Sequence, residues 1–146
     1  MSTRTNHLGN RLVIYYGPTG VGKTYTAEME YPGSKSILCL ESMTPADLLN
    51  QGLREAMESG LAVILEGVNH LSESCLNLLL VVCDGRTEYT EGGLNIKIDD
   101  NFKVVATALF GEGTDRRIAL LLELVAGADA RECYNTPATL AAIAYG

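Results

Sequence analysis

Histidine, cysteine and long apolar runs are scarce in this chain of 146 residues, and each scarcity argues against a class of protein. The two histidines, His7 and His70, are far apart in sequence and suggest no metal site. None of the four cysteines forms C-x-x-C, so we expect buried free thiols in a reducing compartment. No apolar run approaches the ~18 residues of a membrane span, and the polar stretch 1–11 lacks the apolar segment of a signal peptide. We therefore expect a cytoplasmic protein without a membrane segment.

Positive charge is also in short supply. The chain has 11 Lys and Arg residues against 18 Asp and Glu residues, a net charge of −7. This balance argues against broad binding of DNA or RNA, although a small basic loop in the pore of an oligomer would still be possible. The length predicts a single domain over residues 12–146, preceded by a flexible arm over residues 1–11.

The clearest motif lies within residues 12–30. An apolar, β-rich run precedes G-x-x-x-x-G-K-T, and a helix-compatible run follows it. Glycines in such a loop let the backbone wrap tightly and point successive N–H groups at a phosphate, and the next helix adds its positive N-terminal end. All four fixed positions match in the expected context, so the motif predicts a phosphate-binding loop rather than a chance glycine-rich turn.

The residues of this loop predict a nucleoside triphosphate as the ligand. Lys23 is able to reach the β- and γ-phosphates as a point charge, and the Thr24 hydroxyl is able to ligate Mg²⁺. We expect ATP with Mg²⁺, although no residue that would read the base is visible, so GTP stays open. The predicted nucleotide-binding residues are Gly17, Pro18, Thr19, Gly20, Val21, Gly22, Lys23, Thr24 and Tyr25.

Strand and helix patterns alternate along the chain. Apolar runs predict strands over residues 12–16, 36–40, 61–65 and 102–109, with a further strand at 131–134 and a hairpin from 87–90 and 94–98 around Gly92-Gly93. Helical spacing and caps predict helices over residues 22–30, 44–60, 72–82 and 118–126, with a short one at 137–144. The alternation predicts an α/β fold with a parallel sheet and right-handed crossovers. Ligands bind beyond the carboxyl ends of such strands, so the loop and Glu66 are expected to share one site.

Several segments resemble, in order, those of AAA+ ATPases of the MoxR, midasin and dynein-related branch. Residues 65–70 (LEGVNH) resemble the family's L-D-E-[IL]-N-R segment. The other similar segments are 44–49 (T-x-x-D-L-L), 52–60 (G-x-L-x-x-A-x-x-x-G), 84–86 (D-x-G-R, before a pre-sensor hairpin) and 101–107 (N-F-R-V-[IV]-A-T, the sensor-1 strand). The resemblance covers about residues 12–112 and implies a P-loop NTPase-type sheet with an inserted β-hairpin.

The chain departs from this family at the residues that cut the triphosphate. The family's strand ends in an Asp that holds Mg²⁺ and a Glu that polarises the attacking water, and these positions are Glu66 and Gly67 here. The resemblance implies Glu66 and Thr24 as metal ligands and Lys23 and Glu66 as catalytic residues, with Glu66 as a possible replacement base. The family's sensor-1 Asn falls at Leu109, which is unable to orient water.

Two further parts of the family's machinery are not clearly placed. The arginine that a neighbouring subunit inserts has Arg116 and Arg117 as its nearest candidates and Arg131 as another, but these are equally explained as solvent-facing arginines. The chain also ends too early for the helical lid that follows the core in the family. A positioned base contributes about 10²–10⁴-fold to a rate, so we expect nucleotide binding with slow or impaired hydrolysis.

Three functions follow from these patterns. The first is an ATP- and Mg²⁺-binding AAA+-like module that works as a ring or filament and remodels or switches an unidentified protein partner. The second is a non-catalytic nucleotide-binding or purely structural assembly protein. A P-loop kinase or transferase is the third, but it leaves the hairpin and the sensor-like strand unexplained. The helix expected over residues 118–126 is apolar nearly all round, which favours a homo-oligomer unless the C-terminal tail covers it.

Overall fold

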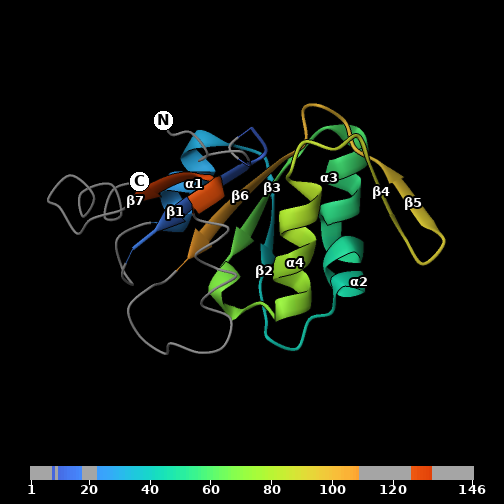
Figure 1. Ribbon diagram of the computed structural model, residues 1–146. Helices are drawn as coiled ribbons and strands as arrows, with labels where there is room; N and C mark the ends of the chain where they lie inside the picture. The colour runs from blue at the N-terminus through green and yellow to red at the C-terminus, as the bar shows by residue number, and fades with distance from the viewer. Residues whose placement is uncertain (1–7, 9, 18–22, 109–125, 133–146) are drawn as a thin grey trace, which may run out of the picture.

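The chain forms an α/β fold in which helices flank a five-stranded parallel sheet and an antiparallel hairpin stands apart from it (Figure 1). In the computed structural model, the described residues are Leu8 and residues 10–17, 23–108 and 126–132. The sheet has the strand order β2-β3-β6-β1-β7, and neighbouring strands pair in parallel throughout. The parallel sheet predicted from the alternation of strands and helices is therefore confirmed.

The elements fall close to the predicted ranges. The strands of the sheet are β1 (Leu12–Tyr16), β2 (Lys35–Leu38), β3 (Ala62–Glu66), β6 (Lys103–Ala108) and β7 (Asp129–Glu132). The hairpin consists of β4 (Glu88–Glu91) and β5 (Leu94–Lys97). The described helices are α1 (Lys23–Glu30), α2 (Pro45–Leu48), α3 (Arg54–Ser59) and α4 (Glu73–Val82), with a π-helical segment at Leu49–Leu53 and a 3₁₀ turn at Val68–His70. The helix expected over residues 118–126 lies outside the described residues except for its last residue, and the one expected over residues 137–144 lies wholly outside them.

The sheet separates two groups of buried side chains. Helices α2, α3 and α4 stand together on one face, over the larger group (Figure 1). On the other face, α1 packs Ala27 into a smaller cluster with Val13, Ile64 and Val105. The chain leaves β1 through α1 to reach the edge strand β2, then returns through β3 to β6 with α2, α3 and α4 between the strands. Because right-handed crossovers in opposite directions use opposite faces, this reversal puts α1 alone on its side of the described sheet.

Three helix boundaries follow from their cap residues, as the sequence predicts. The Thr44 side chain accepts from the Asp47 N–H at 3.1 Å, and the Asp47 carboxylate accepts from the Thr44 N–H at 3.0 Å, which completes a capping box. The Ser72 hydroxyl accepts from the N–H of Cys75 at the start of α4. Gly60 ends α3 in the left-handed conformation, with φ 70°.

The continuous helix predicted over residues 44–60 is wrong, because the segment breaks in its middle. Gly52 has φ 143°, which is not a helical value, and it lies in the π-helical segment between α2 and α3. A Cβ on Gly52 would lie 3.0 Å from Cδ of Lys35, so the Lys35 side chain passes close to the backbone there. Apolar spacing continues across the break, which explains why the sequence pattern alone reads as one helix.

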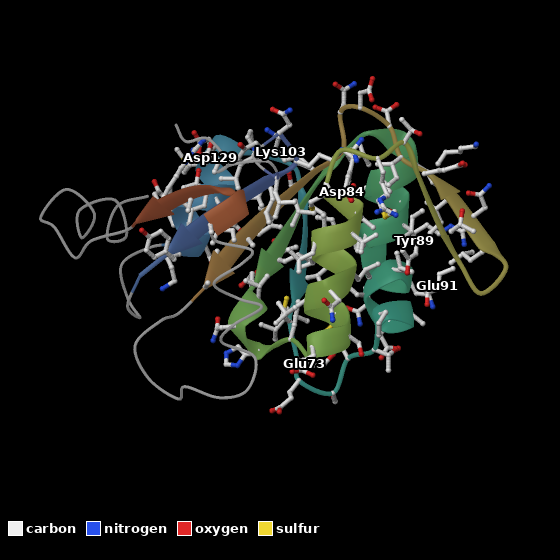
Figure 2. All side chains as sticks on the ribbon, viewed as in Figure 1. Glu73, Asp84, Tyr89, Glu91, Lys103 and Asp129 are labelled. Carbon is white, nitrogen blue, oxygen red and sulfur yellow. The ribbon has the colours of Figure 1, made fainter. Side chains whose placement is uncertain are left out.

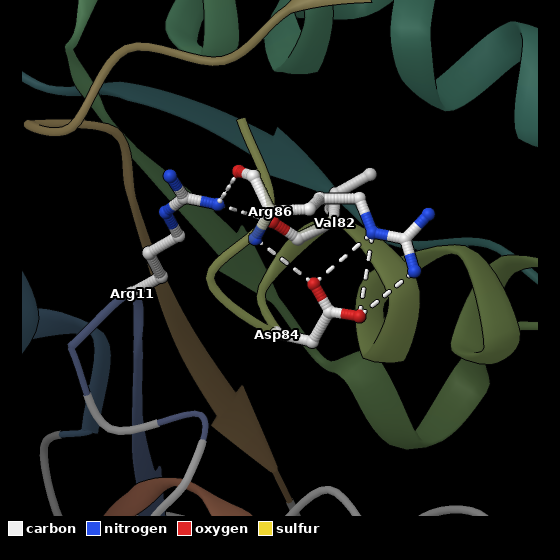
Figure 3. A network of polar contacts seen from close by, with 4 residues as sticks. All are labelled: Arg11, Val82, Asp84 and Arg86. Atoms are coloured by element: carbon white, nitrogen blue, oxygen red, sulfur yellow. Dashed lines mark hydrogen bonds and ion pairs between the residues drawn. The ribbon is translucent and has the colours of Figure 1, made fainter. Parts of the chain in front are cut away.

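The flexible arm predicted over residues 1–11 needs correction at Leu8 and Arg11, which are both buried. The Leu8 N–H donates to the Gly127 carbonyl at 2.7 Å. The Arg11 guanidinium donates to the main-chain carbonyls of Val82 at 3.2 Å and Arg86 at 2.6 Å (Figure 3). The end of the arm is therefore bound to the domain through contacts with residues more than 70 positions away, which no local pattern reveals.

The cysteines agree with the prediction as far as they are described. Cys39, Cys75 and Cys83 are free and buried, and Cys133 lies outside the described residues. Burial raises the pKa of Cys83 to about 12. Within the described part of the chain, no helix has the length and the apolar character needed to cross a membrane.

Candidate functional site

The carboxyl edge of the sheet has the geometry of a ligand site. After β1 the chain continues into α1 on one face, and after β3 it continues into α4 on the other, with β6 between these two strands. Open α/β sheets bind ligands where the connections diverge in this way, beyond the carboxyl ends of the strands. Lys103 and Asp129, which begin β6 and β7, lie at the opposite edge, far from Glu73 at the start of α4 (Figure 2).

A row of polar side chains crosses this edge on the face that α1 covers. Ile64 and Val105 belong to the cluster beneath α1, so Glu66 and Thr107, each two residues further along its strand, face α1 as well. Glu66 and Thr107 are register partners on β3 and β6, and Thr107 pairs in turn with Tyr15 on β1. The Glu66 side chain is half-buried, and Thr107 is buried. The row therefore runs from the Glu66 carboxylate toward the strand that leads into the phosphate-binding motif.

The two ends of the G-x-x-x-x-G-K-T motif meet at the same edge. Gly17 directly follows β1, is buried, and donates its N–H to the carbonyl of Ala108 at the end of β6, at 3.2 Å. Lys23 is the first residue of α1, and its ammonium donates to the Gly17 carbonyl at 3.0 Å. This hydrogen bond joins the first residue of the motif to its lysine. The predicted ligands Pro18, Thr19, Gly20, Val21 and Gly22 lie between these ends and outside the described residues.

The other predicted binding residues follow at the start of α1. Thr24 and Tyr25 occupy the first turn of α1 and are half-buried. Since the Glu66 side chain faces α1, the structure brings Lys23, Thr24 and Glu66 to one edge and one face of the sheet. A hydroxyl and a single carboxylate suit Mg²⁺, which keeps several waters and binds through one or two carboxylates together with substrate phosphates. The described residues contain no group of three or more metal-binding side chains, so this would not be an all-protein cage.

Gly67 is held in a conformation that disfavours a side chain. Its φ of 80° and ψ of 51° lie in the left-handed region, which glycine adopts without steric cost. Its N–H donates to the hydroxyl of Thr107 at 3.0 Å and to the Thr107 carbonyl at 3.1 Å. The position at which the family resemblance expects the water-polarising Glu is therefore fixed by β6 in a backbone shape suited to glycine.

The space beside Gly67 is filled by His70. A Cβ built on Gly67 would lie 2.9 Å from Cδ2 of the His70 ring and 3.7 Å from its Nε2. Real Cβ contacts are not this short, so a side chain at position 67 would require the imidazole to shift. His70 is exposed, and it lies in the turn that follows the carboxyl end of β3.

The candidates for an arginine that acts on a neighbouring subunit are placed differently. Arg116, Arg117 and the sensor-1 position Leu109 lie outside the described residues. Arg131 on β7 forms ion pairs within its own chain, with Glu30 at the end of α1 and with Asp129. It also donates to the Tyr15 hydroxyl at 2.9 Å, and its hydrogen bond to Asp129 raises the pKa of Arg131. Asp129 lies at the amino edge of the sheet (Figure 2). Through its ion pairs with Glu30 and Asp129, Arg131 joins the end of α1 to β7 in this structure.

Sequence reasoning missed Thr107 as a site residue. Thr107 stands in the sensor-like segment 101–107, but its pattern there is that of an ordinary buried strand. Its hydroxyl is recognised only through the hydrogen bond to Gly67, which lies 40 residues earlier. The one signal available was that Thr107 is the polar residue that follows the apolar run of β6, at the edge where ligands bind.

No family model matches the chain, and no curated protein matches it. The interpretation of this site therefore depends on its residues and on their arrangement.

Proposed function

We propose that the protein is an AAA+-like P-loop module that binds ATP with Mg²⁺, hydrolyses it slowly and acts within an oligomeric assembly on a protein partner. The observation that carries this proposal is the 3.0 Å hydrogen bond between Lys23 and the Gly17 carbonyl, at the carboxyl end of β1. It supports a phosphate-binding site here, because it brings the lysine of the motif to the residue at which β1 ends. The parallel sheet and the reversal of its crossovers support a ligand site at the same edge.

Each predicted residue has a part in this proposal that fits its place. Lys23 would give up its carbonyl partner for the phosphates, with the ammonium as a compact positive charge. Thr24 and Glu66 would hold Mg²⁺ from the first turn of α1 and the end of β3, and the ion, when bound, would neutralise charge on the phosphates. Tyr25 and the loop residues 18–22 would complete the cradle. The absence of a side chain at Gly67 explains why hydrolysis would be slow.

Isothermal titration calorimetry of the wild type and of Lys23→Ala with MgATP tests nucleotide binding. We expect the substitution to weaken binding by at least about tenfold, since it removes a charge-assisted contact of about 1.5–3 kcal/mol. Lys97→Ala is the matched control, because Lys97 is an exposed lysine on β5 that pairs with Glu88. Equal affinity of the wild type and Lys23→Ala, or no heat of binding in any of them, would overturn the proposal. A parallel titration with MgGTP decides between the two nucleotides.

The assembly part of the proposal has its own test. Sedimentation velocity with and without MgATP should show a species larger than the monomer at least in the presence of nucleotide. A monomer under both conditions, at concentrations at which calorimetry shows binding, would remove the assembly and leave the nucleotide site in place.

The second candidate is a protein that binds nucleotide without hydrolysing it. The conformation of Gly67 is the observation that favours this candidate. A backbone with φ of 80° favours glycine, and the family's Glu would also have to displace the adjacent His70 ring. Phosphate release above background that Lys23→Ala and Glu66→Gln abolish would exclude this second candidate, whereas binding without any release would establish it.

A further inference from the structure

We infer that His70 takes the part of the missing acidic residue at position 67 and accepts the proton of the water that attacks the γ-phosphate. This inference rests on the proposed function, because it needs a nucleoside triphosphate at the carboxyl edge of the sheet. It goes further in that it assigns a catalytic residue that the family resemblance does not supply.

The backbone around His70 is held in place from both sides. The His70 N–H donates to the Gly67 carbonyl at 2.9 Å, and the Leu71 N–H donates to the Val68 carbonyl at 3.1 Å. Val68 and Leu71 are buried on the two sides of the exposed histidine. The Gly67 N–H in turn bonds to Thr107 on the neighbouring strand. The imidazole is therefore carried by a short turn that is anchored to the core and to the sheet.

The ring lies directly beside the position at which a side chain on residue 67 would start. Its Cδ2 lies 2.9 Å and its Nε2 3.7 Å from the Cβ that Gly67 lacks. Position 67 directly follows Glu66, whose side chain faces α1 and the start of the phosphate-binding helix. A glycine at position 67 thus has a second consequence beyond the loss of the acid, because it leaves room for the His70 imidazole directly beside that position.

The chemistry of the step fits a neutral imidazole. The water oxygen forms a bond to the γ-phosphorus, and the bond from that phosphorus to the bridging oxygen breaks, with its electron pair leaving on the diphosphate. The water proton passes to an unprotonated imidazole nitrogen of His70 and from there to solvent. Histidine is the side chain that most often serves as a general base, and its exposure here lets it return the proton to water.

Glu66 is the competing proton acceptor, and the two residues differ in what they would do. The Glu66 carboxylate stands beside Thr107 on the α1 face and is the described carboxylate proposed to hold Mg²⁺. A metal ligand is poorly suited to act as a base at the same time. Substitution of Glu66 should therefore weaken Mg²⁺ binding and raise the Mg²⁺ concentration that turnover requires. Substitution of His70 should leave that concentration unchanged.

The experiment measures MgATP affinity by calorimetry and phosphate release at saturating MgATP for the wild type, His70→Ala, His70→Gln and His7→Ala. His7→Ala is the control for loss of a histidine elsewhere in the sequence. We expect His70→Ala to lower turnover about 10²-fold with the dissociation constant changed less than about twofold, and His70→Gln to be equally slow because an amide does not accept the proton. Added imidazole should restore part of the turnover of His70→Ala and leave His7→Ala unaffected.

The possible results separate the inference from the function on which it rests. Turnover of His70→Ala within about twofold of the wild type overturns the inference and leaves the proposed function standing. Full activity in His70→Gln also overturns it, because the side chain would then only fill space or position water. Nucleotide binding without turnover in the wild type overturns it in favour of the second candidate, a protein that binds nucleotide without hydrolysing it. Absence of MgATP binding removes the proposed function and the inference together.

Discussion

The Arg11 guanidinium donates to the carbonyl of Arg86 at 2.6 Å and so joins the residue before β1 to the turn after α4, 75 residues away (Figure 3). The same guanidinium donates to Val82 in the last turn of α4, where helix carbonyls lack partners and a cation is favourable. It also lies over the Phe102 ring, 5.9 Å from the centroid. The buried Arg11 side chain thus connects the residue before β1 to the end of α4.

Replacement of Arg11 by Leu should therefore destabilise the fold strongly. The substitution leaves buried carbonyls without their charged donor, which we expect to cost about 2–4 kcal/mol in the free energy of unfolding. Urea denaturation followed by circular dichroism measures this loss. Arg54→Ala is the control, because Arg54 forms an exposed pair with Glu58 one helical turn away and should change stability by less than about 0.5 kcal/mol. Equal effects of the two substitutions would contradict the role given to Arg11.

Gly67 and Gly33 form a natural pair for a second prediction. Their φ values are 80° and 82°, but nothing lies within 4 Å of a Cβ on Gly33, whereas a Cβ on Gly67 would meet the His70 ring. Both alanine substitutions should cost about 1–2 kcal/mol for the left-handed backbone. Since the His70 side chain is exposed and able to turn away, the contact should appear mainly as displacement of the ring.

The displacement has a direct readout in the proton NMR signals of the histidine rings. We expect Gly67→Ala to shift one histidine ring signal and Gly33→Ala to shift neither, with His70→Ala used to identify the signal of His70. An unchanged spectrum in Gly67→Ala would show that the ring does not rest against this glycine in solution.

The third prediction concerns Thr107→Val, which keeps the shape of the side chain and removes the hydroxyl. The Gly67 N–H then retains only its 3.1 Å contact with the Thr107 carbonyl, so we expect a loss of about 1 kcal/mol in stability and faster exchange of the Gly67 amide hydrogen. The Cys39 amide serves as the internal reference, because it donates to the Glu66 carbonyl at 2.9 Å and this hydrogen bond does not involve Thr107. Exchange that changes equally at both amides would point to general loosening of the edge instead.

The accuracy of the sequence predictions depends on whether a feature is local. The strand positions, the helix start after Thr44 and the helix end at Gly60 follow from patterns a few residues long, and the described residues confirm them. The break at Gly52 was missed because the apolar spacing of the segment continues through it. The burial of Arg11 was missed because its partners are distant in sequence.

The same distinction between local and long-range features applies to the candidate site. The motif predicted a strand before Gly17 and a helix that begins near Lys23, and the structure has both, but the hydrogen bond between these two residues was not predicted. The relation of His70 to Gly67 was beyond the sequence, because a glycine leaves its own φ undetermined until the tertiary structure selects a value. The sequence shows that position 67 has no acidic side chain, but only the structure shows that the His70 ring lies beside it.

The fourth prediction is that the buried thiols resist alkylation in the folded protein. Burial raises the pKa of Cys39 to about 12, with smaller contributions from Cys75 and Glu66, and burial likewise raises the pKa of Cys75. The thiolate is the nucleophile, so at pH 8 a thiol with this pKa is ionised to about one part in 10⁴. Iodoacetamide at pH 8 should therefore label neither of these residues nor Cys83 until urea unfolds the chain, as mass spectrometry of tryptic peptides would show. Rapid labelling of Cys39 in native buffer would contradict the packing of β2 against the helices.

The last prediction is a dependence of stability on pH that begins at Asp84. The Arg86 side chain hydrogen-bonds to the Asp84 carboxylate at 2.9 Å and lowers the pKa of Asp84 (Figure 3). The folded state then binds this proton less readily than the unfolded chain, in which an Asp titrates near about 3.9. The stabilisation is therefore fully present above about pH 4 and is lost as the pH falls through the lower value of the folded state. Because the pair is partly exposed, its size should stay below about 1 kcal/mol.

Urea denaturation of the wild type, Asp84→Asn and Arg86→Gln at pH 7 and at pH 3 tests this sign. Asp84→Asn should be less stable than the wild type at pH 7, and the difference should be smaller at pH 3, where the unfolded chain binds a proton at Asp84 more readily than the folded state does. Arg86→Gln should behave alike, because it removes the partner that favours the ionised form, while the Arg86 carbonyl stays available to Arg11. A difference that stays constant from pH 7 to pH 3 would mean that the substituted amide disturbs the turn after α4 by its shape, and the ion pair would then have no measurable part in holding that turn.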